Sequence, residues 1–289
     1  MTTVGYGLVT ISILALATVG FSLQFGITNF LNIAYGDLMT LAAYFWFTFA
    51  YRLHVGIWGA GIFALIAIAM VSVLLNRLLF QPILKRGAAP FTLMVVTLGV
   101  SILILNGIVI FWGPLFFSVH ISGNGPINLL GMQLTGNQIA IIVITAVLLV
   151  GLHLFLKNTL TGKSMRAMAD DEQLTRACGI RVKRVQDVTW FLTGLIAGMA
   201  GFVLCIDTSA FNNSTGNSYL WLLIPAAFLG GLGNPYGAMA GAAVVGAAIE
   251  LADRFLGAQF DVVAAMVVLF GVLLLRPQGI VAVVRKSWS

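Results

Sequence analysis

The sequence has few charged residues: only 8% of its 289 residues are Asp, Glu, Lys or Arg, whereas 60% are hydrophobic. The hydrophobic residues form a long series of apolar stretches, which a water-soluble fold does not tolerate but a lipid environment requires. A strict alternation of apolar and polar residues is also missing, and this disfavours a transmembrane β-barrel, whose strands have a period of two. The sequence therefore predicts an all-α, polytopic helical membrane protein.

Cysteine and recognisable catalytic groupings are scarce as well. The two cysteines, Cys178 in a polar loop and Cys205 in an apolar run, are predicted to be unpaired thiols. The three histidines have no metal-ligand spacing, and neither G-x-S-x-G nor H-E-x-x-H occurs, so we expect no metal site and no catalytic residues. The segment 162–164 imitates the end of a phosphate-binding loop, but position 157, where that motif needs glycine, is Lys157. We therefore expect this chain to bind no cofactor itself.

Nine apolar runs predict nine transmembrane helices. Their ranges are Tyr6–Leu23, Leu38–Tyr51, Gly56–Leu75, Phe91–Trp112, Gln138–Leu156, Val188–Ile206, Tyr219–Gly231, Gly237–Leu251 and Val262–Leu275. The second, seventh and eighth are short and interrupted, so eight spans with one re-entrant segment remain an alternative. Nothing outside these runs can build a separate core, which predicts one membrane domain over residues 1–289. Because no basic residue precedes Arg52, the first run lacks the charged region of a secretory signal and is expected to remain a span.

The distribution of Lys and Arg predicts the orientation in the membrane. Three segments hold three, seven and three basic residues, thirteen of the 15 in the chain: 77–86, 157–184 and 276–286. With nine spans these segments share one side, which the positive-inside rule identifies as the cytoplasm. The N-terminus and the loop 113–137 are then outside, and the C-terminus is cytoplasmic. The net charge of +6 therefore reflects topology, and no nucleic-acid partner is expected.

Polar residues crowd between the first two apolar runs. They are Asn29, Asn32, Tyr35, Gly36 and Asp37. Polar groups at membrane depth need partners or water, so one interpretation is a broken helix that lines a translocation pathway. The alternative is an ordinary interhelical loop, and for Asp37 alone the favoured interpretation is that it caps the second span.

A second break, GGLGNPYGAMAG, occupies a roughly corresponding place in the other half of the chain. Paired interrupted helices often mark a transport pathway, and this makes Asn234 a further pathway candidate. Three small residues four positions apart predict a flat stripe for close helix packing: Gly233, Gly237 and Gly241. Pro235 suits a break or a first helical turn. Glu250 is expected to be a solvated carboxylate near the outer end of its span.

The longest polar segment, about 157–187, is predicted to be a cytoplasmic loop. Helix-forming residues from Lys163 to Cys178 predict a short helix that Gly179 stops. Such a helix on the cytoplasmic surface is a natural docking element. The alternative is a solvated loop that merely joins two spans.

Four segments follow one another in a recognisable order: NFLNIAYGDLMTLAAY, RAMADDEQLTRACGIRVKRV, FLGGLGNPYGAMAGAAVVGAAIE and LLLRPQGI. Together they resemble the permease subunits of branched-chain amino acid ABC importers, most of all the LivH type, over nearly the whole chain. The resemblance implies that the cytoplasmic segment is the loop that couples the permease to its ATPases. The residues that carry it here are Ala169, Asp170, Asp171, Glu172, Gly179 and Ile180. The usual Glu-Ala-Ala start of that loop reads Ala-Asp-Asp in this chain.

This resemblance also implies function and partners. The expected function is a permease subunit that forms part of the pathway for branched-chain or related amino acids in a bacterial inner membrane. Expected partners are membrane lipid, a second permease, an external binding protein, and two ATPase subunits that hold ATP and magnesium, since no Walker motif occurs here. A urea or short-chain amide permease is an alternative substrate class. A stand-alone secondary transporter or channel would usually need charged residues deep in several spans, and Asp37 is nearly the only candidate.

Overall fold

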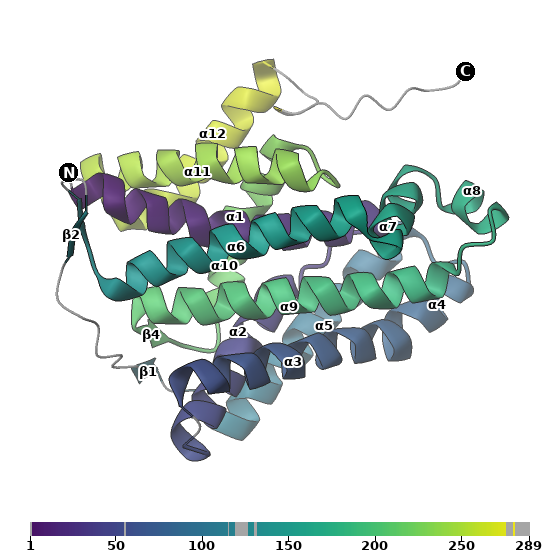
Figure 1. The fold of residues 1–289 in the computed structure, drawn as a ribbon, viewed down its shortest axis with the longest axis horizontal. Helices are drawn as coiled ribbons and strands as arrows, with labels where there is room; N and C mark the ends of the chain where they lie inside the picture. The colour runs from purple at the N-terminus through teal and green to yellow at the C-terminus, as the bar shows by residue number, and fades with distance from the viewer. Residues whose placement is uncertain are drawn as a thin grey trace.

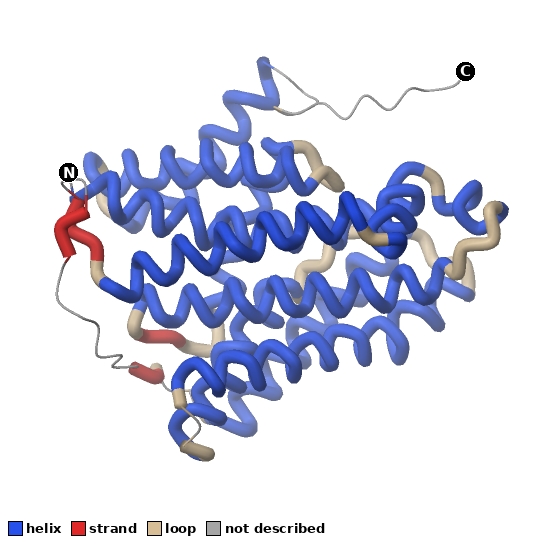
Figure 2. Tube along the Cα trace, viewed as in Figure 1, coloured by secondary structure: helices blue, strands red, loops and turns tan. Residues whose placement is uncertain are grey.

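The computed structural model describes residues 2–54, 56–114, 116–118, 127–129, 132–275 and 280. Most of them are helical, and the long helices lie side by side in one bundle (Figures 1 and 2). The α-helices are α1 (Thr2–Thr28), α2 (Tyr35–Phe47), α3 (Ile57–Leu75), α4 (Gln81–Lys85), α5 (Pro90–Trp112), α6 (Gly136–Asn158), α7 (Leu160–Asp170), α8 (Glu172–Ala177), α9 (Val182–Thr208), α10 (Thr215–Gly230), α11 (Pro235–Phe255) and α12 (Asp261–Leu275). Single π-helical turns follow α2 (Thr48–Arg52) and α3 (Asn76–Phe80), and a 3₁₀ turn (Ala258–Phe260) precedes α12.

Strands are few and short in the described part of the chain. β1 (Phe117–Ser118) pairs antiparallel with β4 (Ala210–Phe211), and β2 (Ile127–Leu129) pairs antiparallel with β3 (Met132–Leu134). The registers join Phe117 to Phe211 and Ile127 to Leu134. Both pairs lie at the end of the bundle where the N-terminus lies, at the left of Figure 1, and they tie the connecting loops together there.

The predicted all-α, polytopic membrane fold is confirmed. Every predicted apolar run lies within a helical stretch, apart from one end residue in each of two runs, Gly56 and Gly231. Seven helical stretches of the described chain are long and apolar enough to cross a membrane: Gly5–Thr28, Gly59–Lys85, Pro90–Trp112, Gly136–Asn158, Val182–Thr208, Pro235–Phe255 and Ala258–Leu275. The other two runs form α2, which the π turn continues without a break to Arg52, and α10, with 16 residues. At about 1.5 Å per residue, α10 does not reach across a hydrocarbon core of about 30 Å by itself.

The helices α1 and α9 lie deepest in the bundle, because glycines let their neighbours come close. A Cβ atom on Gly201 of α9 would collide with the backbone oxygen of Met39 in α2. On another face of α9, a Cβ on Gly194 would lie 2.7 Å from the side chain of Ser72, and one on Gly198 would lie 2.5 Å from Ile68. Small residues spaced four apart thus bring α3 against α9 along much of its length.

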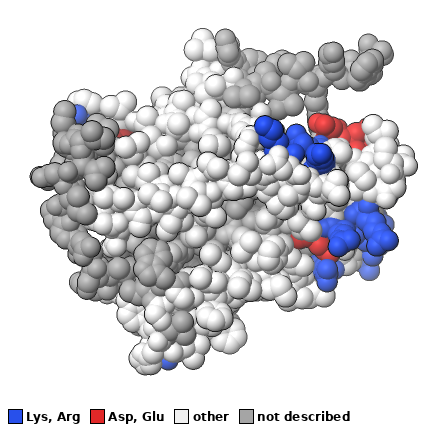
Figure 3. Space-filling model, in the orientation of Figure 1, with Lys and Arg blue, Asp and Glu red and all other residues white. Residues whose placement is uncertain are grey.

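Two of the three basic segments meet at one end of the bundle. The guanidinium of Arg77, after α3, forms an ion pair with Asp187 in the first turns of α9 at 2.8 Å. The helices α4, α7 and α8 lie at this end, which we call the basic end, and Figure 3 shows most of the visible Lys and Arg side chains there. The third basic segment, 276–286, lies outside the described residues apart from Ile280. The packing therefore agrees with the prediction that the first two segments share a side.

Candidate functional site

The break between α1 and α2 turns the chain back into the bundle. Asn29 has a left-handed backbone (φ 56°) and donates its N–H to the carbonyl of Phe25 at 2.8 Å, which ends α1. Asn32 is 2% exposed and donates its Nδ2 to Oε1 of Gln24 at 3.2 Å. The chain then enters α2 at Tyr35. Of these predicted pathway residues, Asn29 is exposed at a helix end, whereas Asn32 and Tyr35 are buried inside the subunit.

Asp37 lies in the first turn of α2 and is completely buried. The interpretation of Asp37 as a cap is wrong, because α2 begins two residues earlier and its N-cap is Ala34, which makes no side-chain hydrogen bond. Ser101 of α5 and Asn217 of α10 face the carboxylate. Within the described chain, however, neither carboxylate oxygen makes a hydrogen bond. Burial of a carboxylate is costly unless its partners compensate for it, and here Ser101 and Asn217 favour the charged form without a hydrogen bond of good geometry.

The short helices α2 and α10 meet at their first turns. The backbones of Gly36 and Gly216 are so close that a Cβ on either one would collide with the carbonyl oxygen of the other. The N–H of Gly216 also donates to Oγ1 of Thr40 at 2.9 Å. Since α10 contributes Asn217 as well, both helices begin beside Asp37, and the junction contains the N-termini of two helices.

The first break contacts two other segments. Gly36, at the end of the break, packs against the segment before α10, and Gly26, at its start, packs against the GGLGNPYG break. Gly233 packs against Gly26 near the end of α1, and Asn234 caps α11 by accepting the N–H of Tyr236 at 3.0 Å. Sequence reasoning missed Gly216 and Asn217. The run of small polar residues at 212–217, directly before an apolar stretch, was the signal that could have found them.

The glycines of α11 bring it against α10. The carbonyl oxygen of Gly237 occupies the place that a Cβ of Gly230 would need, and the backbone of Ala226 does the same for Gly241. Both glycine contacts lie along one stripe of α11, and each allows two helix backbones to approach without intervening side chains.

The polar segment 157–187 contains two helices, so the prediction of one helix from Lys163 to Cys178 is wrong. Asp171 interrupts it with an extended backbone (φ −155°, ψ 110°), and its Oδ1 accepts the N–H of Leu174 at 2.9 Å. Aspartate competes for backbone donors in this way, which favours an N-cap over a helix interior. Asp171 therefore ends α7 and starts α8.

These two helices are anchored on one side and exposed on the other. Met165 and Met168 of α7 are each 1% exposed and pack in a cluster with Leu156, Val182 and Val185. Asp170 and Asp171 are exposed, whereas Ala169, Glu172 and Ile180 are half-buried. Gly179 follows α8 in a left-handed conformation (φ 79°) and donates its N–H to the carbonyl of Arg176 at 3.1 Å. The segment thus presents a charged, sharply terminated helix pair at the basic end.

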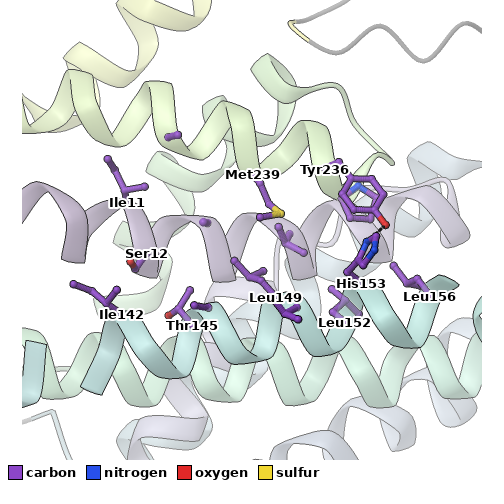
Figure 4. Close-up of a pocket in the computed structure, with 16 residues that line it drawn as sticks. Ile11, Ser12, Ile142, Thr145, Leu149, Leu152, His153, Leu156, Tyr236 and Met239 are labelled. Atoms are coloured by element: carbon purple, nitrogen blue, oxygen red, sulfur yellow. Dashed lines mark hydrogen bonds between the residues drawn. The ribbon is translucent and has the colours of Figure 1, made fainter. Parts of the chain in front are cut away.

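A groove of about 590 Å³ lies between α1, α6 and α11 (Figure 4). Its lining is largely aliphatic and includes Ile11, Leu149 and Met239. At one end, Nδ1 of His153 lies 2.7 Å from the hydroxyl oxygen of Tyr236. Because this lining offers few polar groups, the groove suits an acyl chain or an apolar helix better than the charged ends of an amino acid.

Comparison with known proteins decides the family. Residues 3–276 match the family described as "Branched-chain amino acid transport system / permease component". The chain belongs to this family. It is 27% identical to the high-affinity branched-chain amino acid transport system permease protein BraD of Pseudomonas aeruginosa, over 95% of this chain and 93% of that protein. It is 25% identical to the probable branched-chain amino acid transport permease protein LivH of Methanocaldococcus jannaschii, over 96% of this chain and 90% of that protein.

One solved structure also shares the fold of this permease. It is PsaBC from Streptococcus pneumoniae in complex with Fab, with a TM-score of 0.52 and 13% sequence identity, over 94% of this chain and 91% of that chain. The similarity extends over nearly all of both chains. The arrangement of helices described above is therefore a fold that another protein also adopts.

Proposed function

We propose that this permease is the membrane subunit of an ATP-binding-cassette importer for branched-chain amino acids in a bacterial inner membrane. The observation that carries this proposal is the exposed pair α7 and α8 at the basic end, which Gly179 terminates in a left-handed conformation. A membrane component of this family needs a surface on which an ATPase subunit can dock. The pair α7 and α8 is exposed, charged and anchored to the bundle, as such a docking surface requires. BraD and LivH, which align with this chain over almost their whole length, are both named as branched-chain amino acid permeases, and this supports the substrate class.

The proposed partners follow from this role. Two ATPase subunits, which hold ATP and magnesium, receive the coupling segment through Ala169, Asp170, Asp171, Glu172, Gly179 and Ile180. A second permease subunit completes the pathway, and an external binding protein delivers the amino acid. Lipid surrounds the remaining apolar faces, on which side chains such as Leu274 are 86% exposed.

We further propose that the translocation pathway passes the α1–α2 break. Asn32, Tyr35, Gly36 and Asp37 are buried within the subunit, so they become accessible only when α2 and α10 move apart during the cycle. Asn29 and Asn234 cap the neighbouring helices, and at these helix ends the path would leave the subunit. Isolated ionisable groups at membrane depth commonly have such a functional role.

The decisive experiment is purification of the permease from native membranes, followed by reconstitution with its binding protein. We expect discrete ATPase subunits to copurify and labelled leucine to enter the vesicles when ATP is present. A permease that transports without ATPase subunits would contradict the proposed class. If the binding protein bound urea but not leucine, the ABC-importer assignment would stand, but the substrate would be urea.

Orientation gives a separate prediction. In a Cys178→Ser background, Lys85→Cys and Lys183→Cys are exposed at the basic end, and Ala258→Cys is exposed at the opposite end. An impermeant thiol reagent should label only Ala258→Cys in intact cells, because the basic end faces the cytoplasm and the N-terminal end faces outside. Labelling of all three in disrupted cells is the control. The reverse pattern in intact cells would invert the proposed topology.

A further inference from the structure

A cluster of hydrogen bonds joins the start of α9 to the end of α3. Asp187 accepts Nδ2 of Asn76 at 2.9 Å and Nε2 of Gln81 at 2.9 Å on one carboxylate oxygen. On the other oxygen it accepts Nε of Arg77 at 3.0 Å and a further guanidinium nitrogen at 2.8 Å. Three side chains from one short stretch thus converge on a single carboxylate. We call Asp187 with Asn76, Arg77 and Gln81 the clamp.

The backbone of this stretch is shaped for the clamp. Residues Asn76–Phe80 form a π-helical turn, in which the N–H of Gln81 bonds to the carbonyl of Asn76. In an ordinary α-helix, residues five apart are separated by roughly 140° around the axis. The π turn contains more residues per turn than an α-helix, so it brings Gln81 closer to the face of Asn76. Such turns occur frequently at functional sites.

A stack of buried aromatic rings continues inward from the clamp. One turn along α9 from Asp187, the ring of Trp190 stacks on Phe80 at 4.8 Å between centroids, with 24° between their planes. Phe80 in turn stacks on Phe30 at 5.3 Å and 28°. All three side chains are at most 3% exposed. Ser72 also donates its hydroxyl to the carbonyl of Trp190 at 2.8 Å, which fixes α9 against α3 at this level.

Phe30 belongs to the α1–α2 break, only seven residues before Asp37. The clamp is reached directly from the coupling segment, because α8 is followed by Gly179 and then by α9. A continuous series of rigid contacts therefore runs from the proposed ATPase-docking surface to the buried break: the coupling segment, Asp187, Trp190, Phe80 and Phe30. Close-packed interiors transmit displacement because they cannot be compressed.

We propose that the clamp and the Trp190–Phe80–Phe30 stack form a relay that moves the α1–α2 break when the coupling segment moves. This relay rests on the proposed function, since it needs an ATPase that displaces α7 and α8. Asp187 acts in it as a positioning residue that contacts no substrate. Its carboxylate holds the start of α9 to the π turn, so that both elements and the break shift as one body.

The test reports movement at the break without using a substrate. Thr28, the last residue of α1, is half-buried, and Thr28→Cys in a Cys178→Ser background can carry an environment-sensitive fluorophore. The complex with its ATPase subunits is purified from native membranes, and the fluorescence change on addition of ATP and magnesium is recorded. Asp187→Ala and Phe80→Leu should each reduce that change roughly three- to tenfold. ATPase retention should be unaffected, because the exposed faces of α7 and α8 are not altered.

Matched variants and a double variant make the test specific. Asp253→Ala, an exposed acid, and Phe91→Leu, at a ring that is 74% exposed, should leave the response unchanged. Asp187→Ala and Phe80→Leu interrupt the same relay. The fluorescence change of the double variant should therefore be no smaller than that of the more strongly affected single variant. If Asp187→Ala fails to assemble, Asp187→Asn, which retains an acceptor oxygen but loses the charge, should give an intermediate response.

Several results would overturn the relay. They are a full response in both single variants with the complex intact, multiplied losses in the double variant, or no ATP response at Thr28→Cys in an otherwise unaltered complex that retains its ATPases. A complex that never contains an ATPase would instead overturn the proposed function, and the relay with it. The two failures are therefore distinguishable by subunit retention alone.

Discussion

Asp37→Asn is expected to make this permease more stable and at the same time a poorer transporter. The carboxylate is completely buried, and Ser101 and Asn217 face it without a hydrogen bond of good geometry, so its loss of hydration is only partly compensated in the native state. An amide of the same shape removes the charge and should raise the free energy of unfolding by about 1–3 kcal/mol. If the charge serves a step of transport, leucine uptake by the assembled complex should fall by about tenfold or more, equivalent to about 1.4 kcal/mol.

Asp37→Asn should raise stability and lower transport, and these two effects are measured separately. Thermal unfolding in detergent measures stability, and uptake of labelled leucine into reconstituted vesicles measures transport. Asp253→Asn is the control for uptake, because that carboxylate is exposed and lies away from the break, so its loss should leave uptake unchanged. Full uptake by Asp37→Asn with a raised unfolding temperature would mean that the carboxylate is dispensable and that the break is an ordinary interhelical loop.

Gly179→Val is expected to abolish most of the stimulation of ATP hydrolysis by loaded binding protein. Gly179 has φ 79°, and a Cβ atom built there meets nothing within 4 Å. The damage is therefore confined to the backbone, where a β-branched residue in a left-handed conformation costs on the order of 1–2 kcal/mol. That cost is too small to unfold the bundle, but it is enough to displace α8 from the orientation in which Asp171 and Gly179 hold it.

Two other substitutions separate coupling from general strain. Gly179→Asn should retain most of the stimulation, because asparagine tolerates the left-handed conformation. Gly87 has φ 75° and also meets nothing within 4 Å, but it lies between α4 and α5, so Gly87→Val imposes similar strain outside the coupling segment. Equal losses in Gly87→Val and Gly179→Val, or no loss in either, would contradict a coupling role for this position.

Sequence patterns predicted local features well wherever one strong signal dominated. Continuous apolar runs indicated every long helix, since backbone groups in lipid must be satisfied within the helix itself. The left-handed turn at Gly179 followed from the presence of glycine after a polar helical stretch. Asp171 was misjudged because its side chain can either tolerate a helix interior or start a new helix. The composition of the segment did not separate these two outcomes.

Contacts between distant segments were beyond the reach of these patterns. The sequence by itself determined a bundle of apolar helices, a basic bias at particular loops, and polar breaks at the α1–α2 and α10–α11 connections. Only the tertiary structure decided which breaks meet, because Gly36 and Gly216 are 180 positions apart and their backbones touch without any side chain to mark the contact. It likewise decided that Asp187 and Gln81 belong to one cluster. Hydrogen-bond partners across helices depend on rotation about each helix axis, and a single π turn changes that rotation without leaving a trace in hydrophobic periodicity.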